Sequence, residues 1–118
     1  MGAATHNIVI EQGATFELTA TWTDGGSPVD LTDVLARMQV RKRYTSDEAV
    51  LSVDSDTLGG VTVDPLTGVV DVEIPAADTA ALPGRLRGVY DLELLFPSGR
   101  VVRLLKGRVR VDPEVTKE

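Results

Sequence analysis

The chain has 118 residues, 42% of them hydrophobic and 25% charged, which is the size and balance of one globular domain. Its net charge of −6 argues against non-specific binding to nucleic acid or anionic lipid. No cysteine and a single histidine exclude disulfides and thiol nucleophiles, and leave little material for a zinc site or imidazole catalysis. We therefore expect a non-enzymatic protein with no catalytic residues, no cofactor, no metal and no small-molecule substrate.

The beginning of the chain and its apolar runs bear on targeting. Residues 1–7 contain neither the basic stretch nor the apolar stretch of a secretory signal. No apolar run approaches the roughly 18 residues needed to cross a bilayer. We expect no signal peptide and no membrane span.

Alternation of apolar and polar residues, the pattern of a strand with one buried face, recurs from one end of the chain to the other. About eight strands follow from it at spacings typical of a sandwich or a small barrel. In chain order they cover residues 7–11, 16–22, 34–41, 51–53, 61–63, 70–74, 90–96 and 102–111.

Three local signals lie between or within these strands. Residues 64–68, Asp-Pro-Leu-Thr-Gly, predict a hairpin turn. The Ala-rich segment 76–82, preceded by one proline and followed by another, predicts one or two helical turns. In the last strand, Val102 is apolar on an even position and Val109 on an odd one, which predicts a bulge near 106–107.

These elements predict an all-β fold, an immunoglobulin-like antiparallel β-sandwich of about eight strands with one short helix near 76–82. No repeat or linker divides the chain, so we expect a single domain over 1–118. Its core should cover residues 5–112, followed by a polar C-terminal tail at 113–118.

Charge is segregated along the chain. Residues 1–36 contain no Lys or Arg, whereas residues 37–43 hold four and residues 85–110 hold seven. If the two basic strands are neighbours, they form one basic face opposite acidic surfaces, which suits head-to-tail packing of copies or docking on an acidic partner. The alternative is a row of solvated arginines whose aliphatic stems cover the sheet.

A calcium loop is the one metal motif that the sequence approaches. Asp54 and Asp56 alternate before two glycines, as carboxylate ligands of a hard cation do. Leu58 occupies the position of a third oxygen ligand, however, and Pro65 that of the closing glutamate. We therefore expect no metal site here.

The remaining candidate groups also favour ordinary roles. Asp71 and Glu73 share an outward face and look equally solvated, unlike the paired carboxylates of a glycosidase. His6 lies near the terminus, and the sequence contains no Gly-x-Ser-x-Gly nucleophile motif. Tyr44 is the one aromatic residue out of phase with the apolar faces, which is too little for a sugar-stacking platform.

Taken together, several segments resemble small proteins encoded in the structural-gene clusters of tailed bacteriophages and prophages. A more distant resemblance is to the immunoglobulin-like N-terminal domain that anchors upper baseplate proteins of siphophages, without the receptor-binding extension. The segments that carry the resemblance are residues 11–16 with Trp22, then 28–32, 36–41, 64–68, 76–82, 88–94, 97–107 and 111–116.

The resemblance implies a non-enzymatic virion component at the tail tip, baseplate or fibre attachment point, present in several symmetry-related copies. Such a protein is made in the bacterial host cytoplasm and its partners are other virion proteins. On this hypothesis Arg37, Arg41, Arg103 and Arg108 lie near a protein interface.

A second interface expectation concerns the N-terminal strand. The segment from Asn7 to Ile10 is expected to pair by its strand edge with a neighbouring protein. Two other functions stay open. One is a capsid decoration or head-completion protein, and the other is a ligand- or carbohydrate-binding module that uses Tyr44 or Trp22.

Overall fold

The computed structural model describes residues 3–117, so residues 1–2 and 118 of the predicted domain lie outside it. It confirms a mostly β protein with one short helix. The elements are β1 (Ala4–Thr5), β2 (Ile8–Glu11), β3 (Phe16–Thr21), β4 (Thr23–Asp24), β5 (Ser27–Pro28), β6 (Leu35–Arg41), β7 (Leu51–Asp54), β8 (Val61–Asp64), β9 (Val69–Ile74), α1 (Ala76–Ala80), β10 (Arg87–Leu95) and β11 (Val101–Asp112).

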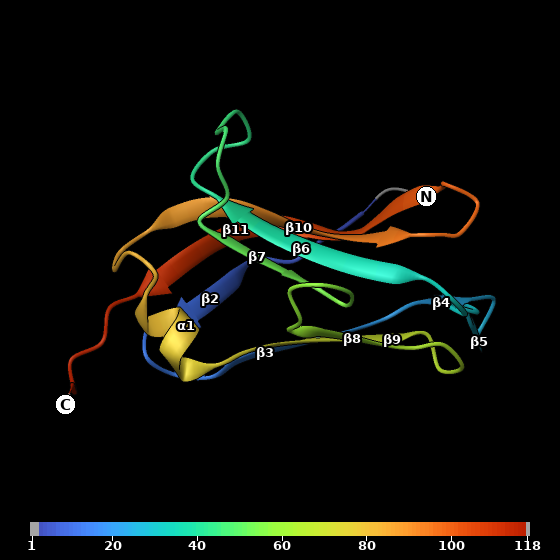
Figure 1. Cartoon of the computed structure of the whole chain (residues 1–118), viewed down its shortest axis with the longest axis horizontal. Helices are drawn as coiled ribbons and strands as arrows, with labels where there is room; N and C mark the ends of the chain where they lie inside the picture. Colours follow the sequence, from blue (N-terminus) through green and yellow to red (C-terminus); the bar gives the residue numbers. More distant parts are fainter. Residues whose placement is uncertain (1–2, 118) are drawn as a thin grey trace.

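Nine of the eleven strands in the described part form two sheets that lie one above the other, and β4 and β5 form a third, two-stranded sheet (Figure 1). The larger sheet has six strands in the order β1-β11-β10-β6-β7, with β2 also paired to β11, and the smaller has the order β3-β9-β8. The described part contains eight strands of four or more residues, and each overlaps one of the eight predicted. Three two-residue strands, β1, β4 and β5, are additional.

The core lies between the two sheets. Ala36, Met38 and Val40 of β6 alternate with polar residues and are buried, as are Leu92 and Leu94 of β10. The opposite sheet contributes the alternate apolar residues of β3, β8 and β9. The predicted alternation therefore identifies the core face correctly, because each strand exposes one face to water and the other to the second sheet.

One aspect of the expected architecture needs correction, because the sheets are not wholly antiparallel. Both β1 and β2 pair with β11 in parallel, with Ile8 opposite Val109 and Val111 opposite Ile10. After β2 the chain crosses to the other sheet as β3, so no hairpin joins β2 to β11. Turn residues indicate strand direction only where they join two strands into a hairpin. No turn joins β2 to β11, so the sequence pattern did not predict that these two strands are parallel.

The bulge predicted near 106–107 lies at Leu104 instead. The pairing of β10 with β11 shifts register at the step Leu92–Glu93, and Leu104 is the unpaired residue. The presence of glycine at position 107 has a different explanation, because a side chain there would collide with the carbonyl oxygen of His6. The glycine accommodates the crossing of the N-terminal segment rather than a bulge.

Tyr90 connects the N-terminal segment to the centre of the larger sheet. It is 3% exposed, and its hydroxyl donates a hydrogen bond to the carbonyl oxygen of His6, between β1 and β2. Burial raises the pKa of the Tyr90 hydroxyl from 10.0 to about 12. The folded state therefore favours the neutral phenol. The contribution of this neutral hydroxyl to the free energy of unfolding is fully present below pH 10 and is lost as the pH rises through about 12.

Tyr90→Phe is expected to reduce the free energy of unfolding at pH 7 by about 1 kcal/mol, because one buried hydrogen bond is lost. The difference in the free energy of unfolding between the two proteins should narrow above pH 10. In that range the unfolded wild type loses the Tyr90 proton while the folded wild type keeps it, which destabilises the wild type alone. Urea unfolding at a series of pH values from 7 to 12 measures this difference. A difference that is constant across this range would contradict the assignment.

Candidate functional site

The outer face of the larger sheet collects the two basic blocks of the sequence. The basic strands β6 and β11 lie on either side of β10 and are not neighbours. In one register row, Glu93 of β10 stands between Arg37 of β6 and Arg103 of β11. The blocks therefore share one face, but an acidic strip on β10 runs between them.

This acidic strip engages two of the arginines that the sequence placed at an interface. Arg37 Nη2 lies 2.9 Å from Glu93 Oε1, and Arg103 Nε lies 3.3 Å from Asp91 Oδ2. Arg41 donates hydrogen bonds to Gln39 Oε1 and to the carbonyl oxygen of Ser46, so it supports the loop between β6 and β7. These three arginines have partners within the chain.

The pKa of the Asp91 carboxyl is raised, mainly by burial and secondly by the neighbouring charge of Glu93. The raised pKa means that the ionised carboxylate is less favourable in the folded state than in the unfolded chain. The free energy of unfolding therefore increases as the pH falls through that pKa.

We expect Asp91→Asn to leave the melting temperature at pH 7 unchanged or slightly higher. A clear decrease would instead assign stability to the Arg103 pair, and thermal denaturation at pH 4 and pH 7 measures the difference.

Beyond the acidic strip, near the start of β10, the same face contains a hollow of about 540 Å³ that we call the basic hollow. Among residues 3–117, five cationic side chains and no carboxylate line it. Both basic blocks of the sequence contribute, and the N-terminal strand forms one side. The lining residues are Asn7, Ile8, Val9, Lys42, Arg43, Tyr44, Arg87, Gly88, Val89, Arg108, Val109 and Arg110.

Strand register and one loop build this hollow. Arg87 and Arg110 are directly opposite in the β10–β11 pair, and Arg108 is opposite Val89. After β6 the chain turns over the beginning of β10, where Gly88 has no side chain to obstruct the carbonyl oxygen of Arg41. The turn makes Lys42, Arg43 and Tyr44 a wall of the hollow.

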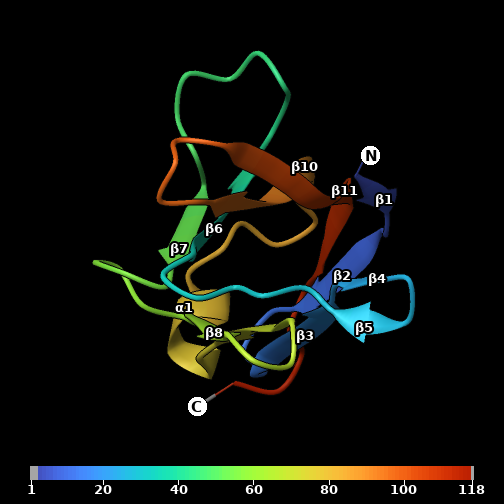
Figure 2. The same ribbon diagram turned by 90° about the vertical axis from the view of Figure 1, so that its right-hand side faces the viewer.

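The wall belongs to the β6–β7 loop, which projects from the body of the protein (Figure 2). Tyr44 on this loop is 79% exposed, and Val9 across the hollow is 44% exposed. Asn7 Oδ1 accepts a hydrogen bond from the backbone N–H of Arg108 at 2.9 Å, which attaches the N-terminal segment to β11. The mouth of the hollow thus combines cations, one aromatic ring and a small apolar area.

The sequence-predicted residues divide by position. Arg108 and Asn7 line the basic hollow, whereas Arg37, Arg41 and Arg103 do not. Ile10 points into the core and exposes none of its surface, which does not fit its expected place at an interface. The segment from Asn7 to Ile10 is already paired with β11 on one edge, so only its other edge is left for a neighbour.

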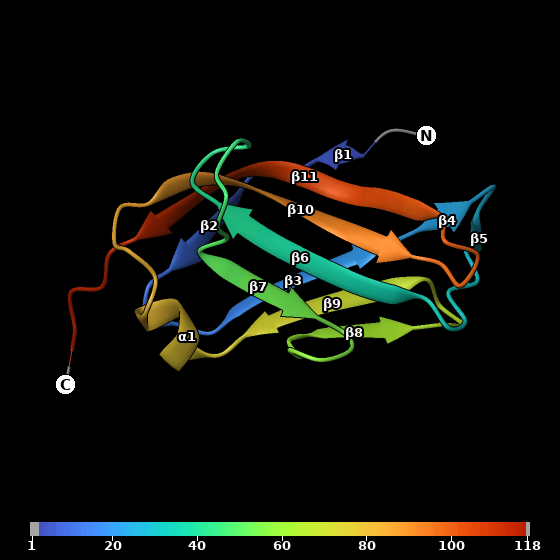
Figure 3. The same ribbon diagram turned by 45° about the horizontal axis from the view of Figure 1, so that its top comes forward.

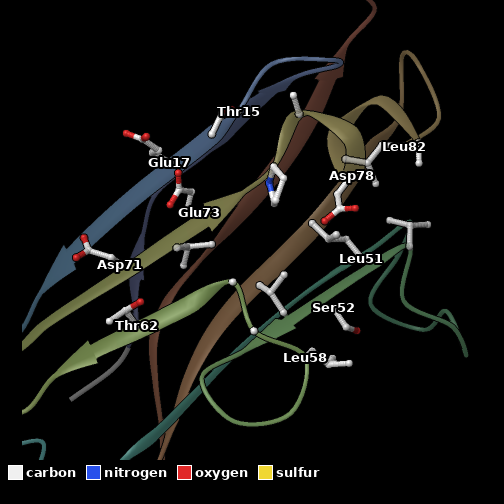
Figure 4. Close-up of a pocket in the computed structure, with 18 of the residues that line it drawn as sticks. Thr15, Glu17, Leu51, Ser52, Leu58, Thr62, Asp71, Glu73, Asp78 and Leu82 are labelled. Atoms are coloured by element: carbon white, nitrogen blue, oxygen red, sulfur yellow. The ribbon is translucent and has the colours of Figure 1, made fainter.

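A second concave surface, which we call the acidic groove, lies where the two sheets diverge beside β7 (Figure 4). It measures about 1090 Å³, and its four carboxylates are Glu17, Asp71, Glu73 and Asp78. No Lys or Arg lines it. Apolar side chains from β7, β9 and the segment after α1 also line the groove, namely Leu51, Val53, Val72 and Leu82, together with Val50 and Leu58.

The acidic groove places like charges together without a cation. Glu17 of β3 is directly opposite Glu73 of β9, and Figure 4 shows the two side chains side by side. Like charges in this position destabilise a sheet. Asp71 accepts a hydrogen bond from the Thr19 hydroxyl at 2.6 Å, and none of the ion pairs among residues 3–117 involves these acids.

The helix end of the groove is anchored by Thr79. Its hydroxyl donates to the carbonyl oxygen of Ala14 at 2.8 Å and accepts the N–H of Gly13 at 3.0 Å. Thr79 is completely buried, so these bonds satisfy a polar group that has no access to water. They fix α1, and with it Asp78, against the connection between β2 and β3.

Asp54, the first residue of the calcium-like motif, has a structural role. Its Oδ1 accepts the N–H groups of Leu58 at 2.7 Å and Asp56 at 3.0 Å, and these bonds, led by that from Leu58, lower the pKa of Asp54. Within residues 3–117 no group of three or more acidic, His or Cys side chains is arranged to hold a metal ion. In the same part of the chain no helix is long and apolar enough to cross a membrane.

The two aromatic residues considered for sugar stacking are in separate places. Trp22 is 8% exposed and packs edge-on against Phe96, with ring centroids 6.2 Å apart. Tyr44 lies on the projecting loop beside the basic hollow. The described structure therefore does not unite these two rings in one platform.

Comparison with known proteins adds no assignment. No protein-family model matches the sequence, and no curated protein matches it. The functional argument therefore depends on the two charged surfaces.

Proposed function

We propose that the protein is a non-enzymatic assembly protein whose basic hollow docks on an acidic surface. The observation that carries this proposal is the gathering of five cations, without a carboxylate, around an exposed tyrosine. Cations held together in this way repel one another. An external anionic group therefore binds with a more favourable electrostatic energy there than at an isolated arginine. Aromatic and arginine side chains are also the residues most enriched in the energetic centres of protein interfaces.

The sequence resemblance supplies the biological setting of the proposal. The protein is then a virion component of a tailed bacteriophage, which joins tail-tip, baseplate or fibre-attachment proteins in several symmetry-related copies. Docking through a charged hollow suits this role, since complementary charges select the partner and fix its orientation.

We also propose that the fold is an immunoglobulin-like sandwich. The order β11-β10-β6-β7 faces the order β3-β9-β8. The chain passes between these two sheets from β2 to β3, from β3 through β4 and β5 to β6, from β7 to β8 and from β9 to β10. Connections of this kind are the Greek-key links of such sandwiches. The short helix α1 lies on the last of these links.

Two alternatives differ in what they predict. A capsid decoration or head-completion protein could use the same hollow, and it differs only in binding assembled heads. A carbohydrate-binding module is less well supported, because Trp22 is buried and Tyr44 stands apart from it.

Affinity capture tests the proposal. Tagged protein is incubated with a lysate of its phage-producing host, and the bound proteins are identified by mass spectrometry. Recovery of tail, baseplate or fibre proteins is the expected result. Recovery of the major capsid protein alone would transfer the assignment to the head, and the absence of any virion partner would contradict a virion function.

A further inference from the structure

We propose that copies of this chain associate head to tail, with the basic hollow and residues Lys42 to Tyr44 of one copy docked in the acidic groove of the next. The inference rests on the proposed docking function of the hollow and names a second copy of the chain as one partner. Charge, shape and position on the molecule each support it.

Charge complementarity is the first argument. The hollow has five cations and no carboxylate, whereas the groove has four carboxylates and no Lys or Arg. The side chains of Glu17 and Glu73 face each other, and none of the ion pairs among residues 3–117 involves either of them. Cations of a second copy would relieve this repulsion, and a local conflict of this kind is expected at a functional surface.

Shape is the second argument. The β6–β7 loop projects from one copy, and the groove is concave and partly apolar (Figures 2 and 4). Tyr44, 79% exposed, is a large ring beside Lys42 and Arg43 at the base of this loop. Inserted into the groove, the ring would contact apolar residues such as Leu51 and Leu58 while the cations reach the carboxylates.

Position is the third argument. The hollow is lined by residues of β2, β10 and β11 in the larger sheet, whereas the groove is lined by residues of β7 and of the smaller sheet. Figure 3 shows β2 and β7 at opposite edges of the larger sheet. One copy can therefore use both surfaces at once. Because the two surfaces differ, the contact is heterologous, and repetition of it gives a ring or an open chain rather than a closed dimer.

Charge-reversal variants provide the test. The hollow variant carries Arg108→Glu with Arg110→Glu, and the groove variant carries Glu17→Lys with Glu73→Lys. A control, Glu11→Lys with Asp24→Lys, makes the same charge change as the groove variant at exposed residues that line neither surface. Sedimentation velocity at about 0.02 M and about 0.5 M ionic strength measures association, and salt should weaken it.

The wild type and the control are expected to form oligomers at low salt that dissociate at high salt. Each variant alone should remain monomeric, and its melting temperature should show that it folds. An equimolar mixture of the two variants should associate again, because the intact hollow of the groove variant docks in the intact groove of the hollow variant, and the two reversed surfaces are again opposite in charge.

Several outcomes would overturn the inference: a wild type that is monomeric at low salt, a variant that still oligomerises, or a mixture that remains monomeric. Its failure is distinguishable from failure of the proposed function. If the wild type is monomeric yet still captures a virion protein through the hollow, the docking function stands and a second copy is not the partner.

Discussion

Leu92→Ala is expected to lower the free energy of unfolding by about 2–5 kcal/mol, the range for removal of a fully buried leucine side chain. Leu92 exposes none of its surface and lies in β10, between Met38 of β6 and Leu105 of β11. Neighbours on both strands are held in hydrogen-bonded register, so they cannot collapse into the space that the smaller side chain leaves. Equilibrium unfolding in urea measures the loss.

Val101→Ala is the matched control for this prediction. Val101 also lies in the larger sheet, but it is 50% exposed, so its truncation should change the free energy of unfolding by no more than about 0.5 kcal/mol. Similar decreases in the free energy of unfolding for the two substitutions would contradict a core located between the two sheets.

Arg108→Glu with Arg110→Glu is expected to reduce affinity for an acidic virion partner by about 100-fold or more. Two cations of the basic hollow become anions, and tenfold for each reversal corresponds to about 1.4 kcal/mol. The melting temperature should change little. Both side chains are exposed, and the one ion pair between them and the rest of the described chain joins Arg110 to Asp112 at 3.7 Å.

The control for this second prediction is Arg100→Glu with Lys117→Glu, which changes the net charge equally at exposed residues outside the hollow. Capture from the lysate with each protein, at equal salt, gives the comparison. Equal losses from both variants would mean that overall charge governs binding and that the hollow has no special part in it.

Strand positions were predictable because burial on one face repeats every two residues. In β6 and β10 every apolar residue on the predicted inner face is buried, and the hairpin at 64–68 joins β8 to β9 as expected. Pairings between distant strands were not predictable in the same way. The parallel pairing of β2 with β11 leaves no turn signal, and Gly107 indicates a close approach of backbone rather than a bulge.

The candidate site was predictable only in part. The two basic blocks were evident, but the hollow depends on the register that sets Arg87 opposite Arg110 and on the path of the β6–β7 loop. The acidic groove was missed. Glu17 and Glu73 are far apart in the sequence, and the outward position of Glu73 suggested solubility until the register of β3 and β9 set the two carboxylates opposite each other.

Site-specific photo-cross-linking tests the docking role of the basic hollow most directly. The chain has no cysteine, so Tyr44→Cys introduces a single attachment point for a benzophenone at the edge of the hollow. Leu66→Cys, at the exposed turn between β8 and β9, provides a control on a different surface. In a lysate of the phage-producing host, we predict cross-links from position 44 to a virion protein or to a second copy, and few from position 66. Equal cross-linking from both positions, or none from position 44, would contradict docking through the basic hollow.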